Sequence, residues 1–262
     1  MLAERGPFFK LNLQGIGEGG HLGEALDIDD DPGSCTPPDD CSDGRDNSLS
    51  SVTLEATKLI DQLAELQALI GDDEAVLVLA NKGPFQPEVF YLLLGTREGM
   101  DSSCDTEAEL CDYLLRPELM DATTCEPLVR FELTSTGDGN GMPGFGEEFS
   151  LQVQVIPDYA PHILRVWRPG FTAKLDDWAG DDQTWQEGVL GGAFHKEDLL
   201  EIVEALPDDF DLSISRQLLK GMLDMFLIPD IDADGDGTPE SVSFGVRFTT
   251  IPAMLSGIAE TD

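Results

Sequence analysis

The stretch that decides the fold is VSFGVRFTTI, at residues 242–251. Apolar and polar residues alternate along it, the apolar set being Val242, Phe244, Val246 and Phe248 and the polar set being Ser243, Arg247 and Thr249. A period of two predicts a strand with one face toward the core. The apolar set is therefore expected to point inward and the polar set outward.

The rest of the chain carries further strand patterns and fewer helical ones. Strands are predicted at residues 8–13, 75–80, 89–95, 128–134, 149–156, 163–167 and 171–175. Apolar residues recur at helical spacing in residues 50–70, 197–206 and 213–227, and Gly or Pro residues follow each run. The predicted class is α+β: mainly β, as an antiparallel sandwich or a barrel-like sheet, with about three α-helices.

Length and composition favour one domain. A chain of 262 residues with 41% hydrophobic residues can bury one large core. Residues 15–49 have no sustained hydrophobic period and are rich in Asp, Gly and Pro. We expect a single domain over residues 1–262, in which residues 15–49 form an acidic loop region held by disulfides and ions.

The charge of the chain excludes several classes of partner. There are 52 Asp and Glu residues against 15 Lys and Arg, for a formal net charge of −37. Such a surface repels nucleic acid and anionic lipid and attracts divalent cations. No apolar run approaches the roughly 20 residues that a membrane helix requires, so no transmembrane segment is predicted.

An acidic stretch directly before residues 242–251 has the spacing of a calcium loop. Counted from Asp232, carboxylates stand at positions one, three, five and nine, a glycine at six and a backbone carbonyl at seven. Ca²⁺ takes six to eight oxygen ligands, which such a loop supplies from alternate residues. The predicted ligands of Ca²⁺ are Asp232, Asp234, Asp236, Thr238 and Glu240. The alternative is a solvated acidic turn.

This spacing resembles the calcium loops of FG-GAP repeats in integrin-like propellers, written Asp-x-Asp-x-Asp-Gly-x-x-Asp. An EF-hand needs an acid at position twelve, where this chain has Ser243. The pattern occurs once, whereas a propeller repeats it at a fixed period. The resemblance therefore implies an ion site and not a propeller.

A second acidic region lies near the start of the chain. Its candidate metal ligands are Asp27, Asp29, Asp31, Asp43 and Asp46, and a flexible acidic linker is the alternative. Residues 41–47 resemble the Cys-x-Asp-Gly-x-Asp-Asn core of metal-binding motifs in secreted bacterial proteins, but Ser48 departs from that pattern. Together, the two acidic regions resemble uncharacterised secreted proteins or lipoproteins of myxobacteria and their relatives. That resemblance implies an extracellular protein or an outer-membrane lipoprotein.

Cysteine usage also favours export. The candidate disulfide residues are Cys35, Cys41, Cys104, Cys111 and Cys125. None of their spacings is the Cys-x-x-Cys of zinc sites, and only three histidines are present, far apart. We expect disulfides with one odd thiol left over, and reduced cysteines in a cytosolic protein are the alternative.

The function suggested by these patterns is a calcium-binding exported protein that acts as a surface, adhesion or carbohydrate-binding module. Trp167, Trp178 and Trp185 are candidates for stacking on a ligand, although core packing is the commoner role of tryptophan. The expected partner is extracellular, either a polysaccharide or a cell-surface protein. A calcium-dependent secreted hydrolase is the alternative, and a scaffold in which calcium is purely structural is a third hypothesis.

The sequence favours a non-enzyme over an enzyme. No nucleophile elbow, zinc-protease motif or phosphate loop is present. His195 lies close to Glu197 and Asp198 and is the one candidate for acid–base work, but a histidine at that position is more often the first residue of a helix.

Overall fold

The fold is described from a computed structural model of the chain. The residues that it describes are 8–13, 26–31, 46–49, 76–81, 89–96, 111–121, 123–135, 141–142, 144–146, 148–153, 162–173, 187–206 and 215–259.

Strands make up most of the fold, in a ten-stranded sheet and a separate two-stranded one. The large sheet contains β1 (Phe8–Leu13), β2 (Val76–Asn81), β3 (Val89–Thr96), β4 (Cys111–Arg116), β5 (Val129–Glu132), β8 (Gly144–Phe145), β9 (Phe149–Val153), β10 (His162–Ala173), β11 (Glu187–His195) and β12 (Ser241–Ile258). The small sheet pairs β6 (Thr134–Ser135) with β7 (Gly141–Met142). A 3₁₀ turn, η3 (Pro117–Leu119), follows β4.

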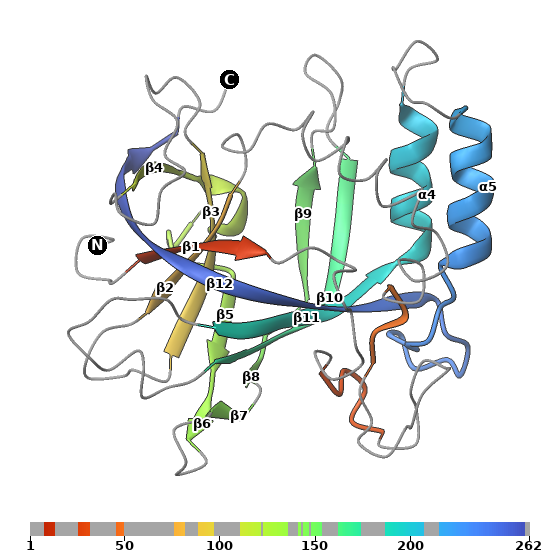
Figure 1. The fold of residues 1–262 in the computed structure, drawn as a ribbon, viewed down its shortest axis with the longest axis horizontal. Helices are drawn as coiled ribbons and strands as arrows, with labels where there is room; N and C mark the ends of the chain where they lie inside the picture. The colour runs from red at the N-terminus through yellow and green to blue at the C-terminus, as the bar shows by residue number, and fades with distance from the viewer. Residues whose placement is uncertain are drawn as a thin grey trace.

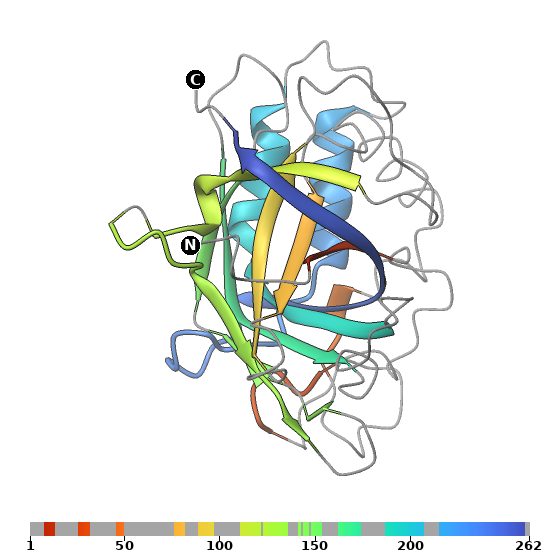
Figure 2. The same ribbon diagram turned by 90° about the vertical axis from the view of Figure 1, so that its left-hand side faces the viewer.

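Strand β12 organises the large sheet. Hydrogen-bonded pairs run from β1 through β2, β3 and β4 to β12, and β12 pairs again with β1, so these strands form a closed ring. The first half of β12 also pairs with β11, which in turn pairs with β10. Strands β11 and β10 form an open wing of the sheet. Figure 1 and Figure 2 show β12, in dark blue, curving across the whole molecule. The fold is mainly β with two described helices, which confirms the predicted β-rich α+β class.

The observed sheet corrects two expectations. The pair β12–β4 is parallel, whereas every other strand pair in the described part of the chain is antiparallel, as predicted. Residues 163–167 and 171–175 are predicted as separate strands, but residues 163–167 and 171–173 belong to one strand, β10, and residues 174–175 lie outside the described residues. A bulge between Trp167 and Gly170 interrupts its pairing with β11, and Arg168 at the bulge has a positive φ of 43°.

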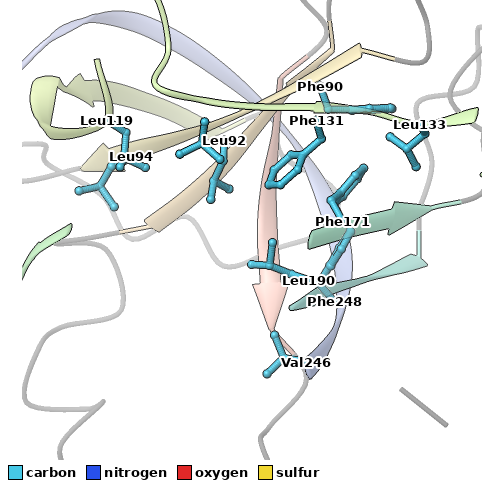
Figure 3. Close-up of a cluster of buried hydrophobic side chains, with 11 residues drawn as sticks. Phe90, Leu92, Leu94, Leu119, Phe131, Leu133, Phe171, Leu190, Val246 and Phe248 are labelled. Atoms are coloured by element: carbon cyan, nitrogen blue, oxygen red, sulfur yellow. The ribbon is translucent and has the colours of Figure 1, made fainter. Parts of the chain in front are cut away.

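The main core lies between the ring and the wing. Phe171 of β10 packs against Phe90, Phe131 and Phe248, with ring centroids 5.0, 5.4 and 5.5 Å apart. All four rings have no exposed surface, and Figure 3 shows them among the aliphatic side chains of the same cluster. Aromatic contacts from three different strands fix the wing against the ring.

Two helices cover the end of the wing. These are α4 (Lys196–Ala205) and α5 (Arg216–Phe226), which lie side by side in Figure 1. They confirm two of the three predicted helices, and the third, at residues 50–70, lies outside the described residues. No helix in the described part of the chain is long and apolar enough to cross a membrane.

The alternation predicted for β12 is confirmed with one correction. Val242, Val246 and Phe248 are buried and Arg247 is exposed, as expected. Ser243 was expected on the wet face but is fully buried. Its hydroxyl lies between the segment before β12 and a segment from the start of the chain, so hydrogen bonds take the place of water.

Candidate metal centres

The first acidic loop connects α5 to β12. Ile231 and Ser241 form an isolated antiparallel bridge at its base, and both are fully buried. The amides of Glu240 and Ser241 donate to the Ile231 carbonyl at 3.2 and 3.0 Å. These backbone bonds hold the two ends of the loop together without a ligand.

The Asp232 carboxylate organises the turn. Its Oδ1 accepts from the amides of Gly235 at 2.8 Å and Asp236 at 3.1 Å, and its Oδ2 accepts from Gly237 at 2.7 Å. Gly235 and Gly237 have φ angles of 76° and 90°, in the left-handed region that glycine adopts without strain. The glycines therefore let the backbone wrap around one carboxylate.

The loop brings together three of the five predicted ligands. One carboxylate oxygen from each of Asp232, Asp234 and Glu240 lies within 4.8 Å of the others. Asp236 is exposed and outside this group, and its Oδ1 accepts the Thr238 amide at 2.8 Å. Thr238 is also exposed, and ligation by its carbonyl stays a prediction.

Glu240 contributes a buried oxygen to this group. Its Oε1 accepts from the Ala233 amide at 2.8 Å and from the Ser241 hydroxyl at 3.3 Å. Its Oε2 is buried and has no hydrogen-bond partner. A buried carboxylate oxygen without a donor is costly, so this atom is suited to accept a cation.

The second acidic region also closes on itself. Leu26 and Asp46 form an isolated antiparallel bridge, in which the Asp46 amide donates to the Leu26 carbonyl at 2.9 Å. The Ile28 amide donates to Asp46 Oδ2 at 2.7 Å. Oxygens of Asp27, Asp29 and Asp46 lie within 4.8 Å of one another.

Burial sets the electrostatics of this second group. Asp46 is only 1% exposed. Burial raises the pKa of Asp46 to about 7. The hydrogen bond from Ile28 lowers this pKa, whereas the negative charges of Asp29, Asp230 and Asp27 raise it further. Burial also raises the pKa of Asp27, whose Oδ1 is enclosed and has no hydrogen-bond partner.

The other residues predicted for this region are placed elsewhere or not described. Asp31 is exposed and outside the group, and its amide donates to Asp29 Oδ1 at 2.9 Å. Asp43 lies outside the described residues. Arg168 is a neighbour that the sequence did not predict, and its guanidinium donates to the Ile28 carbonyl and to Asp30.

The two acidic loops share a hydrophobic base. Leu26, Ile28 and Ile231 are buried in one cluster with Ala193 of β11. Leu26 fills space over two glycines, since a Cβ on Gly170 or Gly191 would lie 2.6 or 3.2 Å from its Cδ1. This cluster places the segment from the start of the chain beside the loop that precedes β12.

Hydrogen bonds join the same two segments. The Ser48 amide donates to Ser243 Oγ at 2.8 Å, and the Ser48 hydroxyl donates to the Ile228 carbonyl. Ser243 in turn donates its amide and its hydroxyl to the carboxylate of Asp230. The sequence did not predict this network, because Ser48 lies far along the chain from Ser243 and Ile228.

The cysteine predictions are tested at one position only. Cys125 is a free, exposed thiol with a positive φ of 55°. Cys35, Cys41 and Cys104 lie outside the described residues, and only the backbone of Cys111 is described. Disulfides among those four residues stay a prediction.

The candidate stacking and acid–base residues are described only in part. Trp167 packs, partly buried, against the cluster beneath the acidic loops, while Trp178 and Trp185 lie outside the described residues. His195 is the residue before α4. Both carboxylate oxygens of Asp198 accept from the guanidinium of Arg165, at 2.6 and 3.0 Å, so this acid anchors α4 to β10.

Comparison of the chain with known protein families, with curated proteins and with solved structures finds no match in any of the three.

Proposed function

We propose that the protein binds Ca²⁺ in the loop between α5 and β12, through Asp232, Asp234 and Glu240. The observation that carries this proposal is the meeting of three carboxylates within 4.8 Å, one of which has a buried oxygen without a hydrogen-bond partner. Among the described residues, no Lys, Arg or His forms an ion pair with any of the three. Three adjacent negative charges repel one another unless a cation neutralises them.

The donor set favours calcium over other metals. All three groups are carboxylates, the hard oxygen donors that Ca²⁺ and Mg²⁺ prefer, and neither Cys nor His is among them. Ca²⁺ accepts irregular geometry and completes its shell with carbonyls and water, whereas Mg²⁺ demands a near-ideal octahedron. A loop that supplies three carboxylates from an exposed turn fits the less demanding ion.

A bound ion would stiffen the start of β12. The loop leads directly into this strand, which pairs with β1, β4 and β11. We infer that the protein is an exported, calcium-stabilised module of a cell surface, which binds a polysaccharide or a surface protein. Sensitivity to extracellular calcium fits dissociation constants on the order of 10⁻⁴–10⁻³ M, which are typical of extracellular modules.

The test is thermal unfolding in millimolar calcium and in excess chelator. Wild-type protein is expected to unfold at a higher temperature in calcium, because a ligand that binds only the folded state stabilises it. Asp234→Asn is expected to lose most of that shift, while Glu201→Gln, which removes one exposed negative charge on α4, keeps it. Equal shifts in the two variants would show that calcium acts through general charge screening and would overturn the proposed site.

The partner is tested separately. Binding of the protein to a panel of polysaccharides and to surface-protein fractions is measured in calcium and in chelator. Binding that requires calcium and fails in Asp234→Asn supports the module. Release of soluble sugars or peptides during the incubation would instead support the calcium-dependent hydrolase.

A further inference from the structure

The two acidic loops are built on the same plan. Each begins with a buried aliphatic residue in an isolated bridge, Leu26 in the first and Ile231 in the second. An Asp-x-Asp pair follows directly in both, and a distant acid joins each pair. The corresponding carboxylates are Asp27 and Asp232, Asp29 and Asp234, and Asp46 and Glu240.

The backbone hydrogen bonds correspond as well. The residue between the paired aspartates donates its amide to the distant acid, Ile28 to Asp46 at 2.7 Å and Ala233 to Glu240 at 2.8 Å. The residue after the second aspartate has a positive φ in both loops, 62° at Asp30 and 76° at Gly235. The described start of the first loop, residues 26–30, thus follows the same backbone pattern as residues 231–235, with a non-glycine residue at the turn.

The burial of Asp46 is evidence for a ligand that is independent of the likeness between the two loops. Asp46 is 1% exposed and faces the carboxylates of Asp27 and Asp29. Among the described residues, no Lys, Arg or His forms an ion pair with it. Asp27 Oδ1 is enclosed and has no hydrogen-bond partner. A buried carboxylate without a counter-charge is strongly unfavourable, and a cation among the three groups removes that cost.

We propose that Asp27, Asp29 and Asp46 form a second divalent-cation site, which takes an ion of the calcium class and fastens the segment around Asp46 to the body of the protein. The ligands come from two described segments, 26–31 and 46–49, so one ion would cross-link them. Ser48, two residues beyond Asp46, already binds Ser243 of β12 and the Ile228 carbonyl. The ion would therefore complete an attachment that the hydrogen bonds begin.

This second site rests on its own residues and does not require an ion in the loop before β12. The two sites are separated by calorimetric titration with calcium chloride, in salt concentrated enough to screen the general attraction of an acidic surface. Wild-type protein is expected to bind two calcium ions. Asp46→Asn and Asp234→Asn are each expected to bind one, and Glu201→Gln two.

The outcomes distinguish the two proposals. One calcium ion in wild type, kept in Asp46→Asn and lost in Asp234→Asn, overturns the second site and leaves the first. The reverse pattern overturns the first and leaves the second. Asp29→Asn guards against a folding defect at the buried position, because Asp29 is only partly buried and its loss is expected to remove the same ion. Two ions in Asp29→Asn and Asp46→Asn alike would place the second ion elsewhere and overturn the inference.

Discussion

The Ser48 amide donates to the hydroxyl oxygen of Ser243 at 2.8 Å and so joins residues that are 195 positions apart. Ser243 is fully buried, and its own hydroxyl donates to Asp230. This one side chain on β12 therefore connects Ser48, from the start of the chain, to Asp230, which precedes the calcium loop. Its loss would remove the hydroxyl acceptor of the Ser48 amide and one of the donors to the Asp230 carboxylate.

Ser243→Ala is accordingly expected to lower the free energy of unfolding by about 2 kcal/mol, because it deletes two hydrogen bonds, one of them to a charged carboxylate. Urea denaturation measures the change. Ser256→Ala is the matched control, since Ser256 lies further along β12, is exposed and makes only a long contact of 3.5 Å with the Tyr113 carbonyl. Equal midpoints for the two variants would refute the role given to Ser243.

The effect of Asp46→Asn is expected to change sign with calcium. In chelator the variant removes a buried charge that has no counter-ion, so it should stabilise the fold by about 2 kcal/mol. In calcium it removes a proposed ligand, so it should be less stable than wild type. Chemical denaturation of both proteins in both buffers checks the reversal, and a variant that is destabilised to the same degree in each would contradict it.

The pH dependence of the metal-free protein follows from the same residue. The pKa of Asp46 is about 7 in the folded state, above its ordinary value of 3.8. Between these values the folded state holds a proton that the unfolded state has lost, so stability should fall as pH rises toward and through 7. Asp46→Asn should flatten this part of the stability profile, measured in chelator.

The ion pair between Asp198 and Arg165 predicts an opposite dependence on pH. Burial raises the pKa of Asp198, but the hydrogen bonds and charge of Arg165 outweigh it, and the net shift is downward from 3.8. A depressed pKa contributes stability above the unfolded value, which is lost as pH falls below 3.8 through the folded value.

Asp198→Asn is therefore expected to destabilise the protein near neutral pH by about 1–2 kcal/mol, a figure reduced because Arg165 is partly exposed. The difference from wild type should shrink as the pH is taken well below 3.8. Urea midpoints across acidic pH measure it, with Glu201→Gln on the same helix as control. A difference that stays constant over the whole range would rule out the charged pair as its source.

The sequence predicted the strands whose pattern is local and missed β4, β7, β8 and β11. Alternation predicted β12, in which Val242, Val246 and Phe248 are buried. An apolar run predicted β3, in which every residue is buried. Strand β11 was missed, since its glycines read as turn residues. A Cβ on Gly188 would lie 2.4 Å from the ring of Phe248, so the glycine is required by a side chain about 60 positions away.

The two candidate metal sites differ in the same way, because one has a local sequence pattern and the other depends on distant residues. Asp232, Asp234 and Glu240 lie within nine residues, so spacing alone sufficed to group them. Asp46 was grouped with Asp27 and Asp29 only as part of a broader acidic region, because nothing local shows that Leu26 and Asp46 form a bridge. The burial of Asp46 depends on tertiary packing and was not predictable from composition.

Two glycines offer a matched pair for testing the backbone of the calcium loop. A Cβ would meet nothing within 4 Å at either Gly235 or Gly221, so neither alanine substitution introduces a steric clash. Gly235 has a φ of 76°, which costs an alanine roughly 1 kcal/mol, whereas Gly221 is in the exposed face of α5, where alanine is favoured by roughly 1 kcal/mol.

Gly235→Ala is thus expected to lower the unfolding midpoint and Gly221→Ala to raise it, in chelator as well as in calcium. Gly235→Ala should also weaken calcium binding, because the strained turn carries the amide that donates to Asp232 at 2.8 Å. Thermal unfolding and calorimetric titration measure the two effects. Unchanged calcium affinity in Gly235→Ala would mean that the ion does not depend on this turn, since the positive φ is the feature that shapes it.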